Sequence, residues 1–364
     1  FLSLMSVDFA PMSPKRVVEA KKDMKQTLLG TGPFQFQSYT VGVSIELTKN
    51  PSYWLAGRPY LDGVSFRIVK DASTRQAALR TGQVHVTGRL FSTLTPSQME
   101  TLKRETPNMN LFPSASLRGP WFFMNLRKPP FSDPRVRRAI NLALDRGAAI
   151  KTIGEGYGLA GNFFPYEGWG LSQADLAPRP GFRQPKDADM SEARSLLAAA
   201  GFPSGFTVNI LSRTAELTKN SAVFMTGQLQ TIGITANVQV LEDALFFDSG
   251  RRAQHEAMVY TPGATIPDPI WMGSFFVKGG SFNFSGNDED TRLNTLWVEQ
   301  SRTLDETKRK SLVRQTEEYL WENLPAIPIV WPYDFLAATP QVRRFVRGSS
   351  GIAENSLQEV WLAR

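Results

Sequence analysis

The chain has 364 residues, with 41 Lys and Arg, 34 Asp and Glu, two His and no Cys. This length predicts two or three domains with ample core. Hydrophobic residues make up 41% and charged residues 21%, which is ordinary for a globular protein and argues against wholesale disorder. The lack of Cys excludes disulfides, thiolate zinc sites, iron–sulfur clusters and thiol nucleophiles within these residues, and two His are too few for a His-rich metal site. We therefore expect no metal and no other cofactor.

The net charge of +7 raises the question of nucleic-acid binding. The basic residues lie in short, scattered groups, such as Arg135–Arg138 and Arg343–Arg347, and none forms a long basic run. This pattern favours solvated faces over a track for phosphates. No apolar run approaches the roughly 18 residues that would span a bilayer. The first residues carry neither a basic segment nor an initiator Met, so we expect no signal peptide there and interpret the start as the interior of a longer protein.

The first half of the chain predicts short strands and helices separated by turns. Apolar alternation, Pro at first-turn positions and Asp or Thr at capping positions are the signals. They predict, in order, a helix over 14–25, strands over 44–48 and 64–69, a helix over 72–80 that ends at Gly82, and helices that begin after Thr95 and after Asp133.

The second half predicts an α/β lobe. A loop rich in Gly and aromatic residues covers 154–170, and Asp189 with Glu192 three residues later predicts a capping box for a helix that ends at Gly201. A strand over 206–210, a helix to Gly233 and a strand over 234–240 follow the βαβ rhythm. A charged helix over 305–322 then leads into the apolar run 326–330.

The sequence motifs give little support for a cofactor site or a metal site. Gly156–Gly161 matches G-x-G-x-x-G, but a dinucleotide site needs a strand before the motif and a helix after it. A helix is predicted before it and Asn162-Phe163-Phe164-Pro165 follows it, so a flexible loop is the preferred interpretation. His255-Glu256 begins like a zinc-protease motif but lacks a second His four residues on, and His85 is predicted on the exposed face of a strand.

Aromatic residues are more informative, because many of the 24 Phe, 8 Trp and 8 Tyr fall at predicted strand ends and loops. Any single one favours packing in a core. Several at strand-to-loop junctions also suit a pocket that encloses a small solute.

Ordered motifs along nearly the whole chain carry a family resemblance. They are Gly30–Phe34, Asn50–Trp54, Leu79–Val84, Asn125–Ile140, Asp145-Arg146, Leu196–Phe202, Pro267–Pro269 and the stretch 305–328. Together they resemble the family 5 extracellular solute-binding proteins of ABC importers, a group of oligopeptide-, dipeptide- and nickel-binding proteins.

The resemblance implies an α/β, two-lobed, periplasmic-binding-protein-like fold (class II, cluster C type) that is incomplete at its N-terminus. In the family, a signal peptide, the first strand of lobe I and most of a small extra domain precede the segment matched by Gly30–Phe34. On this basis residues 1–29 are a remnant of the extra domain, lobe I covers 30–150 plus 336–364, and lobe III covers 151–335. A lobe without its first strand would leave the neighbouring strand unpaired.

The resemblance also implies a ligand site. Peptide-binding members hold the ligand's amino terminus with an Asp three residues before the acidic residue of the Asp-Pro pair, and the matching position here is Thr265. A hydroxyl does not neutralise a buried ammonium, which argues against peptides with a free amino terminus unless Asp268 or another acid serves instead. The candidate ligand-binding residues are Trp121, Phe122, Phe123, Phe164, Tyr166, Trp169, Gly263, Thr265, Asp268 and Trp331.

The implied function is that of the solute-binding component of an ABC importer. It would capture a peptide-like or other small polar solute between two lobes and deliver it, chemically unchanged, to a membrane permease and its ATPase. We expect a monomer in the periplasm or at the outer cell surface that meets the membrane only through the permease and binds no nucleic acid. Two alternatives stay open: a hydrolase that uses Asp or Glu, against which the lack of a nucleophile motif and the shortage of His count, and a nucleic-acid-binding protein, supported only by the net charge.

Overall fold

The computed structural model describes residues 15, 19, 30–69, 71–87, 94–116, 118–165, 168–263, 268–345 and 357–363. Internal contacts divide the chain into two compact units. Unit 1 comprises Phe1–Ser114 with Asp334–Arg364, and unit 2 comprises Ala115–Tyr333. The helix predicted over 14–25, like most of the predicted remnant 1–29, lies outside the described residues.

The boundary between the units differs from the sequence prediction, which placed residues up to 150 with the first lobe. Strand β5 (Trp121–Met124) pairs with β9 (Ala257–Tyr260), and helix α5 (Pro134–Ala143) packs against α8 (Asp187–Ala199). Both partners belong to unit 2, so the first boundary falls at 114 rather than 150, and the second falls at 333 rather than 335. The contact units and the predicted lobes differ at this point because local periodicity does not reveal which sheet a strand joins.

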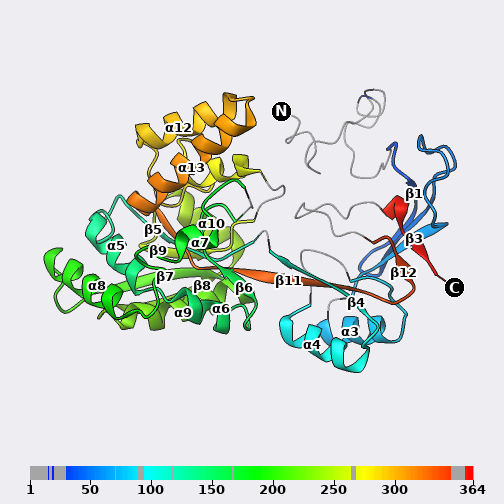
Figure 1. Cartoon of the computed structure of the whole chain (residues 1–364), viewed down its shortest axis with the longest axis horizontal. Helices are drawn as coiled ribbons and strands as arrows, with labels where there is room; N and C mark the ends of the chain where they lie inside the picture. The colour runs from blue at the N-terminus through cyan, green and yellow to red at the C-terminus, as the bar shows by residue number, and fades with distance from the viewer. Residues whose placement is uncertain are drawn as a thin grey trace. The chain divides into compact units, whose positions relative to one another are not determined.

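A five-stranded mixed sheet forms the frame of unit 2 (Figure 1). Its strand order is β10-β5-β9-β7-β8, with β10 at Ala326–Pro328, β7 at Thr207–Arg213 and β8 at Thr235–Leu241. Strand β5 pairs antiparallel with β10 and β9, whereas β7 pairs parallel with β9 and β8. Helix α9 (Glu216–Gln230) connects β7 to β8, which confirms the predicted βαβ unit.

Strand β5 is buried along its whole length because both faces of the sheet are covered. Successive side chains of a strand point to opposite faces. Phe122 and Met124 accordingly join one core cluster with residues of α5, α8 and α9. Trp121 and Phe123 join a second cluster with residues of α12 (Thr291–Arg302) and α13 (Glu306–Asn323). A short run of large apolar residues is therefore a strand buried on both sides.

The other elements of unit 2 surround this frame. They are α6 (Arg146–Thr152), β6 (Gly158–Ala160), α7 (Gln173–Leu176), α10 (Asp243–Arg251), the 3₁₀ helix η1 (Pro269–Met272) and α11 (Gly273–Phe276). Strand β6 pairs with β11 (Val330–Ala338), so the segment that matches G-x-G-x-x-G leads into a strand and not into a helix.

Helix caps match the sequence predictions with one exception. Asp133 caps α5 by accepting the N–H of Arg135, as predicted. The box predicted at Asp189 is wrong, because α8 already begins at Asp187 and Asp189 is fully buried in its first turn. There it pairs with Arg183 and, at 2.9 Å, with Lys186. Asp189 therefore neutralises two basic side chains instead of capping the helix.

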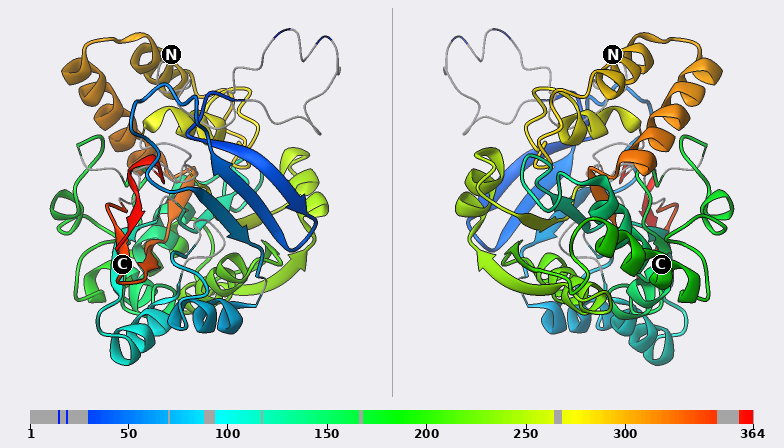
Figure 2. Two further views of the ribbon diagram at one scale, coloured as in Figure 1. Left: turned by 90° about the vertical axis from the view of Figure 1, so that its right-hand side faces the viewer. Right: turned by 90° about the vertical axis from the view of Figure 1, so that its left-hand side faces the viewer.

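Unit 1 contains a three-stranded antiparallel sheet in the order β1-β2-β3, seen in blue in Figure 2. Its strands are β1 (Phe34–Thr40), β2 (Ser44–Lys49) and β3 (Gly63–Arg67), the last two as predicted. Within the described residues, β3 forms one edge of this sheet. The remaining elements are α3 (Ala72–Arg80), α4 (Pro96–Glu105), β4 (Asn110–Ala115), part of β11, β12 (Val342–Arg343), η2 (Leu357–Glu359) and β13 (Trp361–Leu362).

The predicted start of α4 is also confirmed, since the helix begins at Pro96 and Thr95 forms a capping box with Gln98 in the first turn. In the part of the chain that the structure describes, no helix is both long and apolar enough to cross a membrane.

Candidate functional site

Five of the predicted ligand-binding aromatics lie in the interior of unit 2. Trp121, Phe122 and Phe123 on β5, Phe164, and Trp331 on β11 each expose at most 1% of their surface. All five belong to the two core clusters or pack directly within them. Their burial explains how they stabilise unit 2, and their contact with a ligand stays a prediction.

The segment 162–171 carries three predicted residues, and both its ends are tied down. The Nδ2 atom of Asn162 donates to the carbonyl oxygens of Phe164 at 2.8 Å and Leu171 at 3.3 Å. The indole N–H of Trp331 donates to the carbonyl of Asn162 at 2.9 Å. Trp331 therefore positions the segment that carries Phe164 and Trp169. The third predicted residue, Tyr166, lies outside the described residues.

Trp169 is half-buried beside two cations of α13. The guanidinium carbon of Arg309 lies 4.7 Å from the centre of its ring, and the Nζ atom of Lys310 lies 5.7 Å from it. Such cations are attracted to the face of an indole. Arg309 also donates to both carboxylate oxygens of Asp268, at 2.7 and 2.9 Å. Arg309 thus brings together Trp169 and Asp268, two predicted site residues far apart in the sequence.

Asp268 is already engaged by groups of the protein. Besides its two bonds to Arg309, its Oδ1 atom accepts the N–H of Ile270 at 2.9 Å and so caps η1. Its side chain is only 11% exposed. A bidentate guanidinium–carboxylate pair is strong and geometrically specific, so this carboxylate is a poor acceptor for a ligand ammonium. The idea that Asp268 replaces the acid missing at Thr265 therefore loses support.

The segment between Gly263 and Asp268 is described only at its two ends, and Thr265 lies outside the described residues. Gly263 forms an antiparallel bridge with Arg118. A Cβ atom at Gly263 would lie 2.8 Å from the Cγ atom of Arg118, so this close approach requires glycine.

Sequence reasoning missed Glu317, which lies in α13 beneath the segment 162–171. Its side chain is fully buried, and its Oε2 atom accepts the N–H of Leu171 at 2.5 Å. Burial raises the pKa of the Glu317 carboxyl to about 7, although the N–H groups of Leu171, Phe164 and Phe163 act in the opposite direction.

A signal for Glu317 was present in the sequence. It follows Val313 by four residues and precedes Leu320 by three, and both of these residues are buried. An acid therefore interrupts the apolar stripe of α13. The predicted helix was treated only as a charged helix, without asking which charge lies on its apolar face.

The two His do not share a site. His255 is buried in unit 2, with its Nε2 atom 3.0 Å from the carbonyl oxygen of Phe284, and burial lowers its pKa to about 4. His85 is exposed as predicted, but it lies at a bend of unit 1 and not on a strand. Among the residues that the structure describes, no cluster of three or more His, Cys, Asp or Glu is placed to hold a metal ion.

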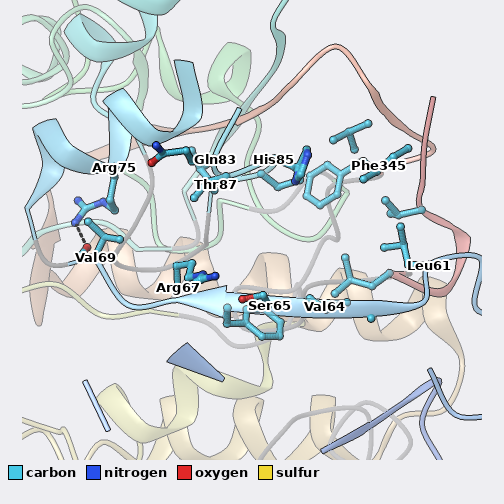
Figure 3. Close-up of a pocket in the computed structure, with 18 residues that line it drawn as sticks. Leu61, Val64, Ser65, Arg67, Val69, Arg75, Gln83, His85, Thr87 and Phe345 are labelled. Atoms are coloured by element: carbon cyan, nitrogen blue, oxygen red, sulfur yellow. Dashed lines mark hydrogen bonds between the residues drawn. The ribbon is translucent and has the colours of Figure 1, made fainter. Parts of the chain in front are cut away.

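Unit 1 holds a separate cavity of about 390 Å³ beside β3 (Figure 3). Strand β3 forms one wall and the segment 83–87 forms the opposite wall. The end of β11 and the residue after it hold this segment, since the N–H of Thr87 donates to the carbonyl of Ala337 at 2.9 Å and the N–H of Thr339 donates to the carbonyl of His85 at 2.8 Å. Among the predicted ligand-binding residues that the structure describes, none lines this cavity.

Comparisons with known proteins agree with the resemblance. The model of the family described as bacterial extracellular solute-binding proteins, family 5 Middle, matches residues 2–284. Glutathione-binding protein GsiB of Salmonella choleraesuis is 28% identical over 343 residues, which cover 88% of this chain and 62% of the relative. Di/tripeptide-binding protein 1 of Pseudomonas aeruginosa is 28% identical over 342 residues, which cover 90% of this chain and 60% of the relative.

A solved structure supports the predicted fold. The periplasmic binding protein DppA of Helicobacter pylori, in complex with the peptide STSA, matches with a TM-score of 0.78 and 27% identity, over 100% of this chain and 70% of that chain. This likeness confirms the predicted α/β fold of periplasmic binding proteins. The chain spans 60 to 62% of the length of the curated relatives described above. It belongs to the bacterial extracellular solute-binding proteins of family 5.

Proposed function

We propose that this chain belongs to the substrate-binding component of an ABC importer, which captures a peptide-like or other small polar solute and hands it, chemically unchanged, to a permease and its ATPase. Membership of the family and the binding proteins among the relatives support this proposal. The solute would lie between two lobes, for which we take units 1 and 2. The protein would act as a monomer in the periplasm or at the outer cell surface, without nucleic acid.

The observation that carries the proposal is the way in which the chain joins the two units. It passes from unit 1 to unit 2 after Ser114 and returns after Tyr333. These crossings fall within β4 and β11, which are neighbours in the sheet β4-β11-β6. A few residues at such crossings can absorb a change in φ and ψ while each unit keeps its own core. A solute that contacts both units would then favour a closed state.

The charges of the predicted site favour some solutes over others. The carboxylate of Asp268 is neutralised by Arg309, and position 265 carries a hydroxyl instead of an acid. A ligand ammonium would therefore lack its usual acidic partner. We expect solutes that present neutral polar groups or a carboxylate to bind better than short peptides that depend on a free amino terminus.

Thermal unfolding with separate solute pools tests this function. The pools are short peptides, the same peptides N-acetylated, sugars, amino-acid derivatives, metal chelates and duplex DNA. A solute at 100 times its Kd adds about 2.7 kcal/mol to the stability of the folded state. We expect one solute pool to raise the Tm, and N-acetylated peptides to raise it at least as much as free ones.

A matched pair of variants shows whether the predicted site is responsible. Trp169→Ala should abolish the shift, whereas Trp54→Ala, at an exposed position of unit 1, should keep it. A shift with duplex DNA alone, or no shift with any solute pool, would contradict the proposed function.

A further inference from the structure

A buried carboxylate supports the segment that carries Trp169. Glu317 exposes none of its side chain, and within the described part of the chain it forms no ion pair. Burial of an ionisable group is costly unless hydrogen bonds compensate it. The bond from Leu171 N–H to Oε2 of Glu317, at 2.5 Å, is such a compensation. The helix α13 and the segment 162–171 are therefore tied to each other through Glu317.

The side chain of Glu317 packs closely against Gly170. A Cβ atom at Gly170 would collide with Oε2 of Glu317 and would lie 2.8 Å from the Cβ atom of Phe164. Asn162 bonds to the carbonyl oxygens of both Phe164 and Leu171, so it closes the segment on itself. Trp169 therefore lies two residues from Leu171, whose backbone is held by both Glu317 and Asn162.

The same helix also contacts Trp169 directly. Arg309 lies eight residues before Glu317, about 12 Å along the axis of α13. Its guanidinium carbon is 4.7 Å from the centre of the Trp169 ring, and its N–H groups hold Asp268. One helix thus sets the position of Trp169 and of Asp268, which belong to the two predicted binding segments.

We infer that Glu317 is a positioning residue of the solute site, which fixes the segment 162–171 so that Trp169 meets the solute. The inference rests on the proposed function for the contact between Trp169 and the solute. It adds that Glu317 holds Trp169 in place for this contact. Glu317 itself does not touch the solute in this account.

Few charged groups face Glu317. The described part of the segment 162–171 has no titratable side chain. Beyond α7, the guanidinium of Arg179 interacts electrostatically with Glu317 and pairs with Glu318 at 2.5 and 2.7 Å. Burial raises the pKa of this carboxyl from 4.5 to about 7, so the closed segment favours the neutral form and opening becomes easier as the pH rises towards 7.

Three variants of the full chain test the inference. Glu317→Leu removes the acceptor, Glu317→Gln keeps an oxygen for the N–H of Leu171, and Glu322→Gln removes an equal charge from an exposed position on the same helix. The readout is amide hydrogen exchange of peptides that cover 162–172, compared at equal global stability. We expect exchange about tenfold faster or more in Glu317→Leu, and within about threefold of the natural chain in the other two variants.

A pH profile separates positioning by the carboxylate from simple packing. Exchange of this segment, corrected for the intrinsic effect of pH, should become faster from about pH 4.5 to 7 in the natural chain, because the hydrated carboxyl of the open segment ionises at lower pH than the buried one, and should stay flat in Glu317→Gln. This comparison decides the matter even if Glu317→Leu does not fold. Equal profiles in both chains, or equal exchange in Glu317→Leu and Glu322→Gln, would overturn the inference.

Solute affinity gives the second readout. The solute found by the thermal screen should bind at least tenfold more weakly to Glu317→Leu and within threefold of normal to Glu317→Gln. A loosened segment with unchanged affinity would overturn the positioning role. If no solute binds the natural chain, the proposed function fails, whereas hydrogen exchange still decides whether Glu317 orders the segment.

Discussion

The two units use their apolar residues in different ways. In unit 2 the five-stranded sheet carries packed side chains on both faces, and β5 is wholly buried. In unit 1 every residue of β1 after Phe34 is exposed, including Phe36 and Tyr39. Because burial of apolar surface is the main favourable contribution to folding, the difference shows that the cores of unit 2 supply most of the stability. We therefore expect the sheet of unit 1 to open locally at a lower free energy than the sheet of unit 2.

The same substitution in both sheets tests this difference with the largest expected effect. Phe123→Ala on β5 should lower the free energy of unfolding by about 3–5 kcal/mol, because it empties a packed site. Phe36→Ala on β1 should cost less than about 1 kcal/mol, since the ring is already 43% exposed. Urea unfolding of both variants measures the two losses. Equal losses would show that the sheet of unit 1 is packed in solution.

The buried His255 extends the comparison to pH. The pKa of His255 is about 4 in the folded chain and near 6.5 in the unfolded chain, so the unfolded chain binds the proton more readily. This contribution to stability is complete above pH 6.5 and is lost as the pH falls towards 4, by about 3 kcal/mol in all. His255→Gln should flatten the fall between pH 6.5 and 4 relative to the natural chain. Urea unfolding of both chains across this range checks the prediction, and parallel profiles would contradict the assignment.

Two ion pairs give the smallest expected difference. The pair of Arg309 and Asp268 in unit 2 is largely buried, with side chains 17% and 11% exposed, while Arg80 and Glu105 in unit 1 are 48% and 37% exposed. Arg309→Met leaves a carboxylate short of its partner and should cost about 2 kcal/mol. Arg80→Met should cost less than about 1 kcal/mol. The urea unfolding midpoints of the two variants measure the two losses of stability. Equal shifts of the midpoint would mean that the pair of Arg309 and Asp268 is well hydrated.

Local features of the fold could be predicted because they depend on a few neighbouring residues. Thr95 before Pro96 predicted a cap, and the alternation over 206–240 predicted the βαβ unit of β7, α9 and β8. The membership of segment 115–150 in unit 2 could not be predicted, because it depends on pairing with β9, more than a hundred residues away. Asp189 misled for a related reason, since its basic partner Arg183 precedes the helix that Asp189 was expected to cap.

The candidate site was predictable only in part. Trp121 on a buried strand has the same sequence signature as a Trp that lines a pocket, because the side of the sheet that is covered is decided by distant elements. The meeting of Trp169 and Asp268 depends on Arg309 of α13, a contact between segments that no local pattern records. Glu317, by contrast, was visible as an acid on an apolar stripe.

The most direct test of the account is a distance measurement between the two units. The chain has no Cys, so spin labels can be attached at introduced cysteines. One pair joins the units, with Lys103→Cys on α4 and Ser195→Cys on α8, and a control pair lies within unit 2, with Ser195→Cys and Glu299→Cys on α12. All three positions are exposed.

If the chain is a solute receptor that closes, the solute found by the thermal screen should shift and narrow the distance distribution of the first pair and leave the second pair unchanged. A solute that binds tightly while both distributions stay the same would contradict capture between the two units.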